Sequence, residues 1–229
     1  MIRLAIIVIF VSLTASSVLA GTWRDDFENG NASDASWEWF DLWELEDGEY
    51  SLNYFNVPQD IIWCTLMGDA IWKDYTVRCK MRYISEPSGL AGIMFRHTDN
   101  ARYGFGINAD DNTAGGWKAL DPVVTRLLND PLRFTLSKDI WYELKVIAEG
   151  DHCEFYIDEK LASEFKDNSI PSGKVGFYVR NVHAHFDDFI VSGDDVKDGG
   201  NWDPAKHQGE KAVEPKNKLA TAWGKIKSD

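Results

Sequence analysis

Residues 74 to 84 read D-Y-T-V-R-C-K-M-R-Y-I, and their strict alternation of side-chain character decides the fold. The apolar positions are Tyr75, Val77, Cys79, Met81 and Tyr83, and the positions between them are Thr76, Arg78, Lys80 and Arg82. A period of two is typical of a β-strand that has one face against a core and the other toward solvent. The segment therefore predicts a half-buried strand with a basic outer face.

Similar segments extend in both directions, from Trp23 to Gly193, and turn residues separate them. Asp47-Gly48 stands between two alternating runs, and T-D-N-A at 98–101 joins A-G-I-M-F-R-H to R-Y-G-F-G-I-N; both patterns predict hairpins. Helical periodicity is almost absent in this range. The pattern is that of an antiparallel all-β sandwich or barrel.

The two ends of the chain differ from this middle part. Residues 1–20 combine Arg3, an apolar run and a small-residue end at S-V-L-A, which predicts a cleavable signal peptide and a secreted, extracellular or periplasmic protein. The run is too short for a membrane span, so we expect none in the mature protein. Residues 194–229 are charged and contain Gly and Pro, which predicts a linker. The linker ends in a short amphipathic segment around Trp223, either a frayed terminus or a docking tag.

Charge and cysteine content exclude several classes of protein. The 229 residues carry 24 Lys and Arg against 37 Asp and Glu, a formal net charge of −13, which disfavours a nucleic-acid partner. The three cysteines allow at most one disulfide. His183-Ala-His185 would direct two imidazoles to one face of a strand, but the sequence shows no third ligand nearby, so a surface role is favoured. The oligomeric state is left open.

The order of motifs resembles a known superfamily. D-D-F-E-N-G at 25–30, W-K-D-Y-T-V-R-C-K-M-R at 72–82, and A-G-I-M-F-R-H-T-D-N-A-R-Y-G-F-G-I at 91–107 look like the concanavalin A-like, laminin-G-type jelly rolls of secreted bacterial proteins. The resemblance covers 21–193 and implies an antiparallel two-sheet jelly-roll sandwich followed by a short C-terminal tail. This superfamily includes carbohydrate-binding modules, laminarinase-type glucanases and keto-disaccharide hydrolase-like domains, so the resemblance implies a polysaccharide or other glycan as partner.

An acidic pattern tests the enzymatic alternative. Glu149, Asp151 and Glu154 have the E-x-D-x-x-E spacing with which the glucanases carry their catalytic carboxylates on one strand. Here Gly150-Asp151 separates two alternating runs, and this pair is typical of a hairpin turn. A solvated turn would not raise the pKa of a carboxyl group as a general acid requires. We therefore predict a hairpin and assign no catalytic residue.

A binding face is predicted instead from the side chains that alternate with the core positions. If the strands at 75–83, 91–97, 102–108 and 174–180 share one sheet, its outer face is basic and aromatic and contains mid-strand glycines, where a ligand would approach the backbone closely. Arginine forks suit the carboxylate, sulfate or hydroxyl pairs of a sugar. The candidate ligand-binding residues are Arg78, Arg96, Arg102, Asn108, Trp117, Tyr178 and Arg180.

Two alternatives accompany this face. Its cations would pair with acidic cross-strand neighbours such as Glu143 and Glu154 if it were an ordinary solvated surface. Trp117, expected in a Gly-rich loop, would serve as a stacking platform for a pyranose ring or as a core or loop anchor.

The resemblance also implies a structural calcium ion where the chain ends meet in this superfamily. Asp26, Glu28 and Asp187 are the residues that would supply carboxylate ligands. The competing interpretation is that Asp25 and Asp26 are solvated and that Asp187 or Asp188 caps a turn.

The sequence thus favours a secreted, non-catalytic glycan-binding jelly roll. The alternatives are a glycoside or keto-disaccharide hydrolase of the same superfamily and a structural or adhesive extracellular domain.

Overall fold

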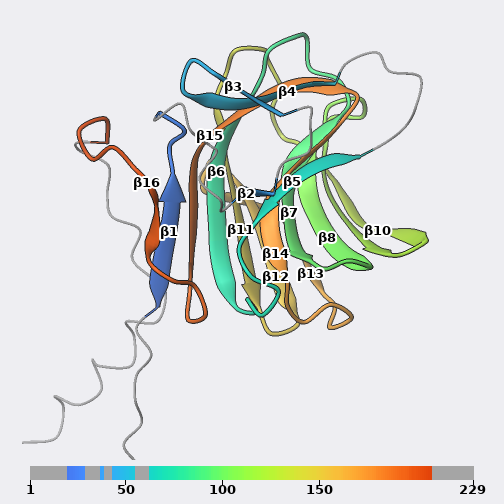
Figure 1. Cartoon of the computed structure of the whole chain (residues 1–229). Helices are drawn as coiled ribbons and strands as arrows, with labels where there is room; N and C mark the ends of the chain where they lie inside the picture. The colour runs from blue at the N-terminus through green and yellow to red at the C-terminus, as the bar shows by residue number, and fades with distance from the viewer. Residues whose placement is uncertain (1–19, 29–36, 39–42, 55–61, 208–229) are drawn as a thin grey trace, which may run out of the picture.

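The computed structural model describes residues 20–28, 37–38, 43–54 and 62–207 (Figure 1). In this part of the chain the strands form two sheets that pack as a sandwich, which confirms the predicted all-β jelly-roll class. Among the described residues we find no helix with the length and apolar character to cross a membrane. Residues 1–19 of the predicted signal peptide and the amphipathic segment around Trp223 lie outside the described residues.

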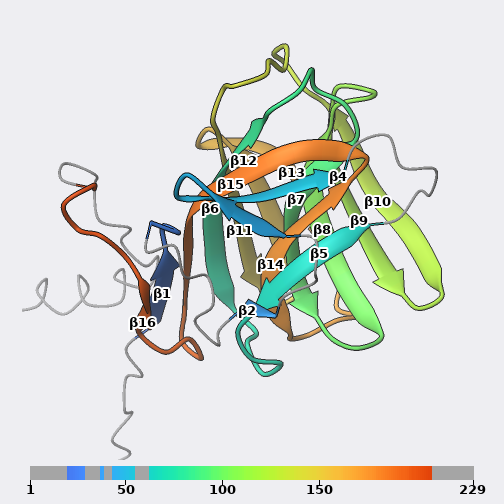
Figure 2. The ribbon, with the colours of Figure 1, turned by 45° about the horizontal axis from the view of Figure 1, so that its top comes forward.

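One sheet has nine described strands. Its main path runs β13 (Lys160–Lys166), β12 (His152–Ile157), β11 (Tyr142–Glu149), β6 (Tyr75–Tyr83), β15 (Val182–Gly193), β1 (Gly21–Asp25) and β16 (Gly199–Asn201). The long strand β15 pairs first with β4 (Glu49–Tyr54), which pairs with β3 (Glu44–Glu46), and later with β1. Figure 2 shows β15 curving over the sandwich with β4 beside it.

The other sheet has seven described strands. Their order is β10 (Val123–Pro131), β9 (Thr113–Leu120), β8 (Ala101–Asn108), β7 (Leu90–His97), β14 (Lys174–Arg180), β5 (Trp63–Met67) and β2 (Trp37–Glu38). All of these neighbours pair antiparallel.

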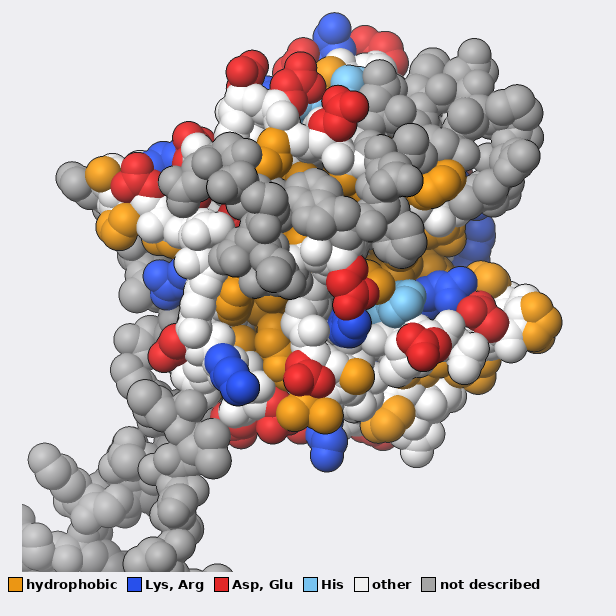
Figure 3. Space-filling view, viewed as in Figure 1, with side chains coloured by type: hydrophobic (Ala, Val, Ile, Leu, Met, Phe, Trp, Pro, Cys, Tyr) orange, Lys and Arg blue, Asp and Glu red, His pale blue; other side chains and the backbone are white. Residues whose placement is uncertain are grey.

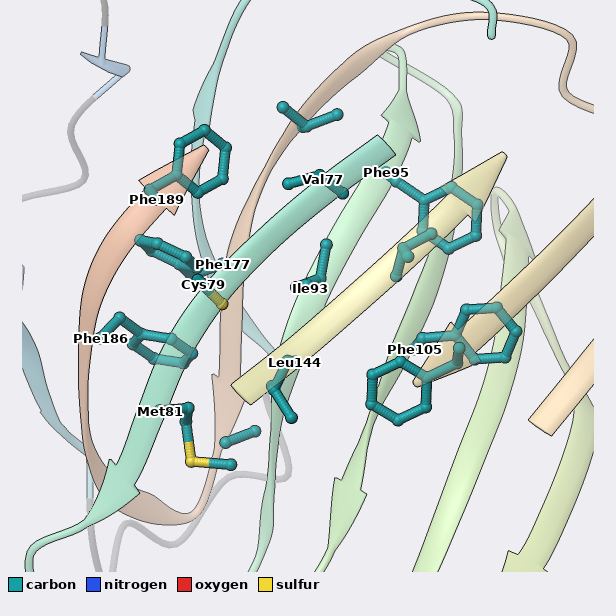
Figure 4. Close-up of a cluster of buried hydrophobic side chains, with 14 of the residues drawn as sticks. Val77, Cys79, Met81, Ile93, Phe95, Phe105, Leu144, Phe177, Phe186 and Phe189 are labelled. Atoms are coloured by element: carbon teal, nitrogen blue, oxygen red, sulfur yellow. The ribbon is translucent and has the colours of Figure 1, made fainter. Parts of the chain in front are cut away.

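The alternation that predicted the fold determines which side chains form the core. All five apolar side chains of β6 are buried, and the residues between them are partly exposed, as predicted. The inward residues of the seven-stranded sheet, which include Ile93, Phe105 and Phe177, meet them from the other side. Figure 4 shows Phe177 facing Phe186 and Phe189 of β15, so aromatic rings join the two sheets. The three cysteines are free.

The predicted hairpins are confirmed, but the C-terminal boundary is not. Asp47 and Gly48 have positive φ angles of 52° and 79° and join β3 to β4, while residues 98–100 join β7 to β8. Residues 199–201, predicted as linker, instead form β16, which pairs in parallel with β1. The backbone N–H of Asp26 donates to the carbonyl of Asn201 at 3.1 Å and continues this pairing. The fold therefore includes part of the segment after Gly193.

Candidate functional site

The outer face of the seven-stranded sheet carries most of the predicted binding residues. Arg102, Trp117, Tyr178 and Arg180 all belong to strands of this sheet and alternate with its core residues. Arg102 and Asn108 lie at opposite ends of β8, and Lys174 and Arg180 at opposite ends of β14. Figure 3 shows an apolar hollow to the right of the centre of the view, with acidic, basic and histidine side chains gathered beside it.

Arg78 does not belong to this face. It lies on β6, in the nine-stranded sheet, so the single basic face predicted from the sequence is divided between two sheets. Its nearest charged neighbours include Glu143 on β11, where burial raises the carboxyl pKa and the Arg78 guanidinium lowers it. The register partner of Arg78 on β11 is Lys145, and Glu143, the acidic residue that the alternative interpretation named, is its diagonal neighbour on that strand.

The mid-strand glycines make room for the protein's own aromatic rings. A Cβ atom at Gly104 would lie 2.4 Å from the Trp117 ring, and one at Gly106 would lie 2.5 Å from the Tyr178 hydroxyl oxygen. Trp117 lies on β9 and not in a loop, and its Nε1–H donates to the Tyr178 hydroxyl at 3.1 Å. The two side chains are 7% and 0% exposed. Trp117 is therefore packed as an anchor, and the predicted stacking platform is wrong for this arrangement.

Five polar side chains converge at one end of the face, and we call them the charged cluster: Glu38, His97, Arg102, Asp121 and Lys174. Arg102 Nη1 lies 2.9 Å from Asp121 Oδ2, and Lys174 forms an ion pair with Glu38 across the sheet. His97 is the cross-strand partner of Lys174. The cluster draws one residue from each of β2, β7, β8 and β14 and one from the turn after β9, so the antiparallel pairing of the sheet assembles it.

A bulge in β7 explains why sequence alternation missed His97. The pairing of β7 with β14 shifts register between Lys174 and Gly176, and Arg96 has a positive φ of 48°. Such a bulge reverses the facing of the residues that follow it. Regular alternation would direct Arg96 outward and His97 into the core. The bulge instead buries Arg96 and brings His97 to the charged cluster.

Arg96 was predicted to bind a ligand, and the structure contradicts this. Its side chain is fully buried, at 0% exposure. The guanidinium donates to the carbonyls of Lys73 at 3.0 Å, Gly150 at 2.9 Å and Ile170 at 3.3 Å. These three carbonyls belong to separate connections between strands, so Arg96 holds one end of the sandwich together.

The surroundings of His97 in the charged cluster lower the pKa of its imidazole. Burial, and after it the positive charge of Arg102, lower the pKa of His97 from 6.5 to about 4. Glu38 raises the same pKa, while Lys174 lowers it. The imidazole is consequently neutral at pH 7, and it is partly exposed beside two cations. A neutral imidazole in this position can accept a proton or a hydrogen bond.

The opposite end of the face is less open. Asn108 is buried, and its side-chain oxygen accepts the backbone N–H of Asp110 at 3.2 Å. Arg180 is partly exposed and lies opposite Leu90 of β7, which in turn pairs with Asn108 of β8. Asn108 and Arg180 thus lie at the same end of the seven-stranded sheet.

The acidic pattern at 149–154 forms the predicted hairpin. Glu149 ends β11, Gly150 has a φ of 56°, and His152 begins β12 as the partner of Glu149. The three carboxylates therefore do not share one strand. The Glu154 carboxylate accepts the Tyr156 hydroxyl at 2.6 Å.

The residues predicted to bind calcium lie near one another and already have cationic partners. Lys206 forms an ion pair with Glu28, and its Nζ is 3.6 Å from Asp187 Oδ2. The carboxylate of Asp26 accepts the backbone N–H of Asp203 at 2.6 Å and lies 3.3 Å from His207 Nε2. Because Lys206 supplies the cation shared by Glu28 and Asp187, these residues do not fit an open calcium shell. A melting temperature that falls when a calcium chelator is added would support the structural calcium ion that the resemblance implies.

The family is decided by comparison with known sequences. Residues 20–192 match the model of the 3-keto-alpha-glucoside-1,2-lyase-like domain. The chain belongs to this family. A search of curated proteins gives no match to the chain.

Solved structures confirm the fold of the chain. It is similar to a carbohydrate-binding module, CBM66, from Bacillus subtilis, with a TM-score of 0.61 and 18% identity over 69% of this chain and 96% of that one. A β-glucanase from Bacillus licheniformis gives a TM-score of 0.58 and 11% identity over 75% and 97%. The GH43 protein BlXynB from the same organism gives 0.59 and 16% over 73% of this chain and 38% of that one. At these identities the likeness concerns the fold alone.

Proposed function

We propose that this domain binds a carbohydrate on the outer face of its seven-stranded sheet, with the charged cluster as the polar end of the site. The observation that carries the proposal is the convergence of the five cluster residues at one end of a face that also carries the partly exposed apolar side chains of Ile62 and Cys64. Sugars are recognised by a few fixed polar groups beside apolar surface. Arg102 and Lys174 donate, and Glu38 and Asp121 accept, which suits the hydroxyl pairs of a sugar ring. The carbohydrate-binding module and the β-glucanase with this fold support the same class of ligand.

Replacing both cations of the cluster tests the proposal. In the Arg102→Ala/Lys174→Ala variant we expect the affinity for the best saccharide of a glycan array to fall at least about 100-fold, because each of the two charged hydrogen bonds contributes about 1.5–3 kcal/mol. Isothermal titration calorimetry measures the change.

The matched control is Lys145→Ala. Lys145 forms an equivalent ion pair with Glu159, but on the nine-stranded sheet. We expect this variant to bind like the wild type. Equal loss in both variants, or no loss in the double variant, would count against the site.

A second candidate function is elimination on a 3-keto-glycoside, and neutral His97 favours it. A ketone at C3 acidifies the C2 proton, a base removes this proton, a C1–C2 double bond forms, and the C1–O bond breaks to release the alcohol, which takes up a proton. His97 is deprotonated at neutral pH, and Arg102 and Lys174 lie near enough to stabilise the enolate oxygen. The family description supports this reaction class.

This second function predicts a particular pH dependence. Because a base acts only when deprotonated, kcat/KM for a 3-keto-glucoside should rise with pH through about 4, the pKa of His97, and stay level above it. We expect His97→Asn to lower kcat/KM at least about 100-fold. NMR titration of the His97 ring should give the same pKa. An active His97→Asn variant, or a kcat/KM profile that does not follow the measured pKa of His97, would reject this role.

We also propose that the domain is exported after removal of residues 1–20. The proposal rests on the charged start and apolar run of that segment. Amino-terminal sequencing of protein recovered outside the cytoplasm should begin at Gly21.

A further inference from the structure

Two histidines and a glutamate come together on the outer face of the nine-stranded sheet. Ala184 and Phe186 of β15 face the core, so the alternation of the strand places His183 and His185 on the opposite side. Glu46 reaches them from the end of β3, because the Asp47-Gly48 turn folds the β3–β4 hairpin beside β15. Glu46 is the third residue that the spacing of the two histidines could not reveal.

The distances between these side chains match those of a metal site. His183 Nε2 and His185 Nε2 are 3.3 Å apart, and His185 Nε2 is 3.7 Å from Glu46 Oε2. All three ligand atoms lie within 4.8 Å of one another. Two ligands of a tetrahedral zinc ion, each bound at 2.0–2.1 Å, are separated by about 3.3 Å. A small shift of the exposed Glu46 side chain would complete the geometry.

A second set of side chains holds His185 in the orientation that a metal ligand needs. The Nδ1 atom of His185 lies 2.7 Å from Glu49 Oε2, and a carboxylate only accepts hydrogen bonds. Glu49 therefore favours a proton on Nδ1, and in the neutral imidazole the lone pair of Nε2 is directed toward His183. Arg82 donates to both oxygens of Glu49, at 2.7 Å and 2.5 Å, and stacks 4.8 Å from the centre of the Trp141 ring. Carboxylate–histidine pairs of this kind orient the ligands of known metal sites.

Burial adds to this arrangement. The His185 side chain is only 6% exposed. Glu49 contacts one of its ring nitrogens and His183 contacts the other, so the position of Nε2 is fixed. Two imidazoles and one carboxylate form the ligand set of catalytic zinc sites, in which the fourth position is open to water or substrate.

We propose that Glu46, His183 and His185 bind one divalent transition-metal ion, with zinc the best fit, and that Glu49 and Arg82 position His185 for it. The site lies on the opposite sheet from the charged cluster, so it stands independently of the proposed carbohydrate function. Its open coordination position would take water or an oxygen of a ligand.

Titration of the chelator-stripped protein with zinc chloride tests the proposal. We expect one equivalent of Zn²⁺ to bind with a Kd below about 10 µM and to raise the melting temperature. His183→Ala should weaken binding at least about 100-fold, and Glu49→Gln, which removes no ligand but weakens the contacts of this residue with His185 and Arg82, about 10- to 100-fold. Cobalt substituted for zinc should show the visible absorption of a tetrahedral site.

The matched control is His152→Ala. His152 forms a similar His–Glu group with Glu154 and Glu164, but both of its ring nitrogens face carboxylates. This variant should keep the wild-type affinity for zinc. A wild-type Kd above about 10 µM, unchanged affinity in His183→Ala, or loss of binding in His152→Ala would overturn the proposal. His183 is only half-buried, so its replacement leaves the core intact, and folding of each variant is checked by circular dichroism.

Discussion

Replacement of Arg96 by alanine should lower the free energy of unfolding by about 3–5 kcal/mol. The side chain is fully buried, and its guanidinium serves carbonyls of three separate connections, those of Lys73, Gly150 and Ile170. Alanine would leave these groups without their donor, and each buried acceptor that loses its partner costs about 1–3 kcal/mol. Urea unfolding followed by tryptophan fluorescence measures the difference.

Two further variants separate this structural role from a charge effect. Arg96→Lys keeps the charge but not the planar fork, so it should recover only part of the stability. Arg102→Ala removes an arginine from a partly exposed ion pair and should cost less than about 1 kcal/mol. If Arg96→Ala unfolded at the wild-type urea concentration yet lost saccharide binding, Arg96 would be a ligand residue after all.

Replacement of Phe177 by alanine should cost a similar amount for a different reason. Phe177 lies on β14, and its ring stacks on Phe186 of the opposite sheet at 4.3 Å between centroids and on Trp37 at 5.4 Å. Alanine would leave a cavity where the two sheets meet, and such truncations cost about 3–5 kcal/mol. For a chain of this size we expect the melting temperature to fall by about 6–20 °C.

Phe134→Ala is the matched control for this truncation. Its ring is 38% exposed, so its removal should cost about 1 kcal/mol. Thermal denaturation of both variants measures the contrast. Equal effects would mean that the aromatic cluster around Phe177 does not hold the sheets together.

The sequence predicted the fold well because the relevant signal is local. The alternation in 74–84 and the turn pairs Asp47-Gly48 and Gly150-Asp151 depend on neighbouring residues only, and the structure confirms the strand and both hairpins. The two-sheet arrangement came from the resemblance. The boundary after Gly193 was missed because β16 is short and polar, and a polar stretch gives no strand signal.

The candidate site was harder to predict because it depends on the order of the strands in the two sheets and on the bulge in β7. Nothing in the local pattern of β6 shows that Arg78 belongs to the other sheet from Arg102. The bulge at Arg96 exchanges the facing of Arg96 and His97, and no Gly or Pro marks it in the sequence. Contacts between distant residues, such as Glu46 with His183, appear only after the chain is folded.

The most direct test of the proposed site follows the histidine side chains during ligand binding. The chain has five histidines, which long-range ¹H–¹⁵N NMR spectra can resolve. On titration with the best saccharide of the array, we predict that the ring signals of His97 shift in proportion to occupancy while those of His152 and His183 stay in place. Shifts at His152 or His183 with an unchanged His97 would contradict a carbohydrate site at the charged cluster.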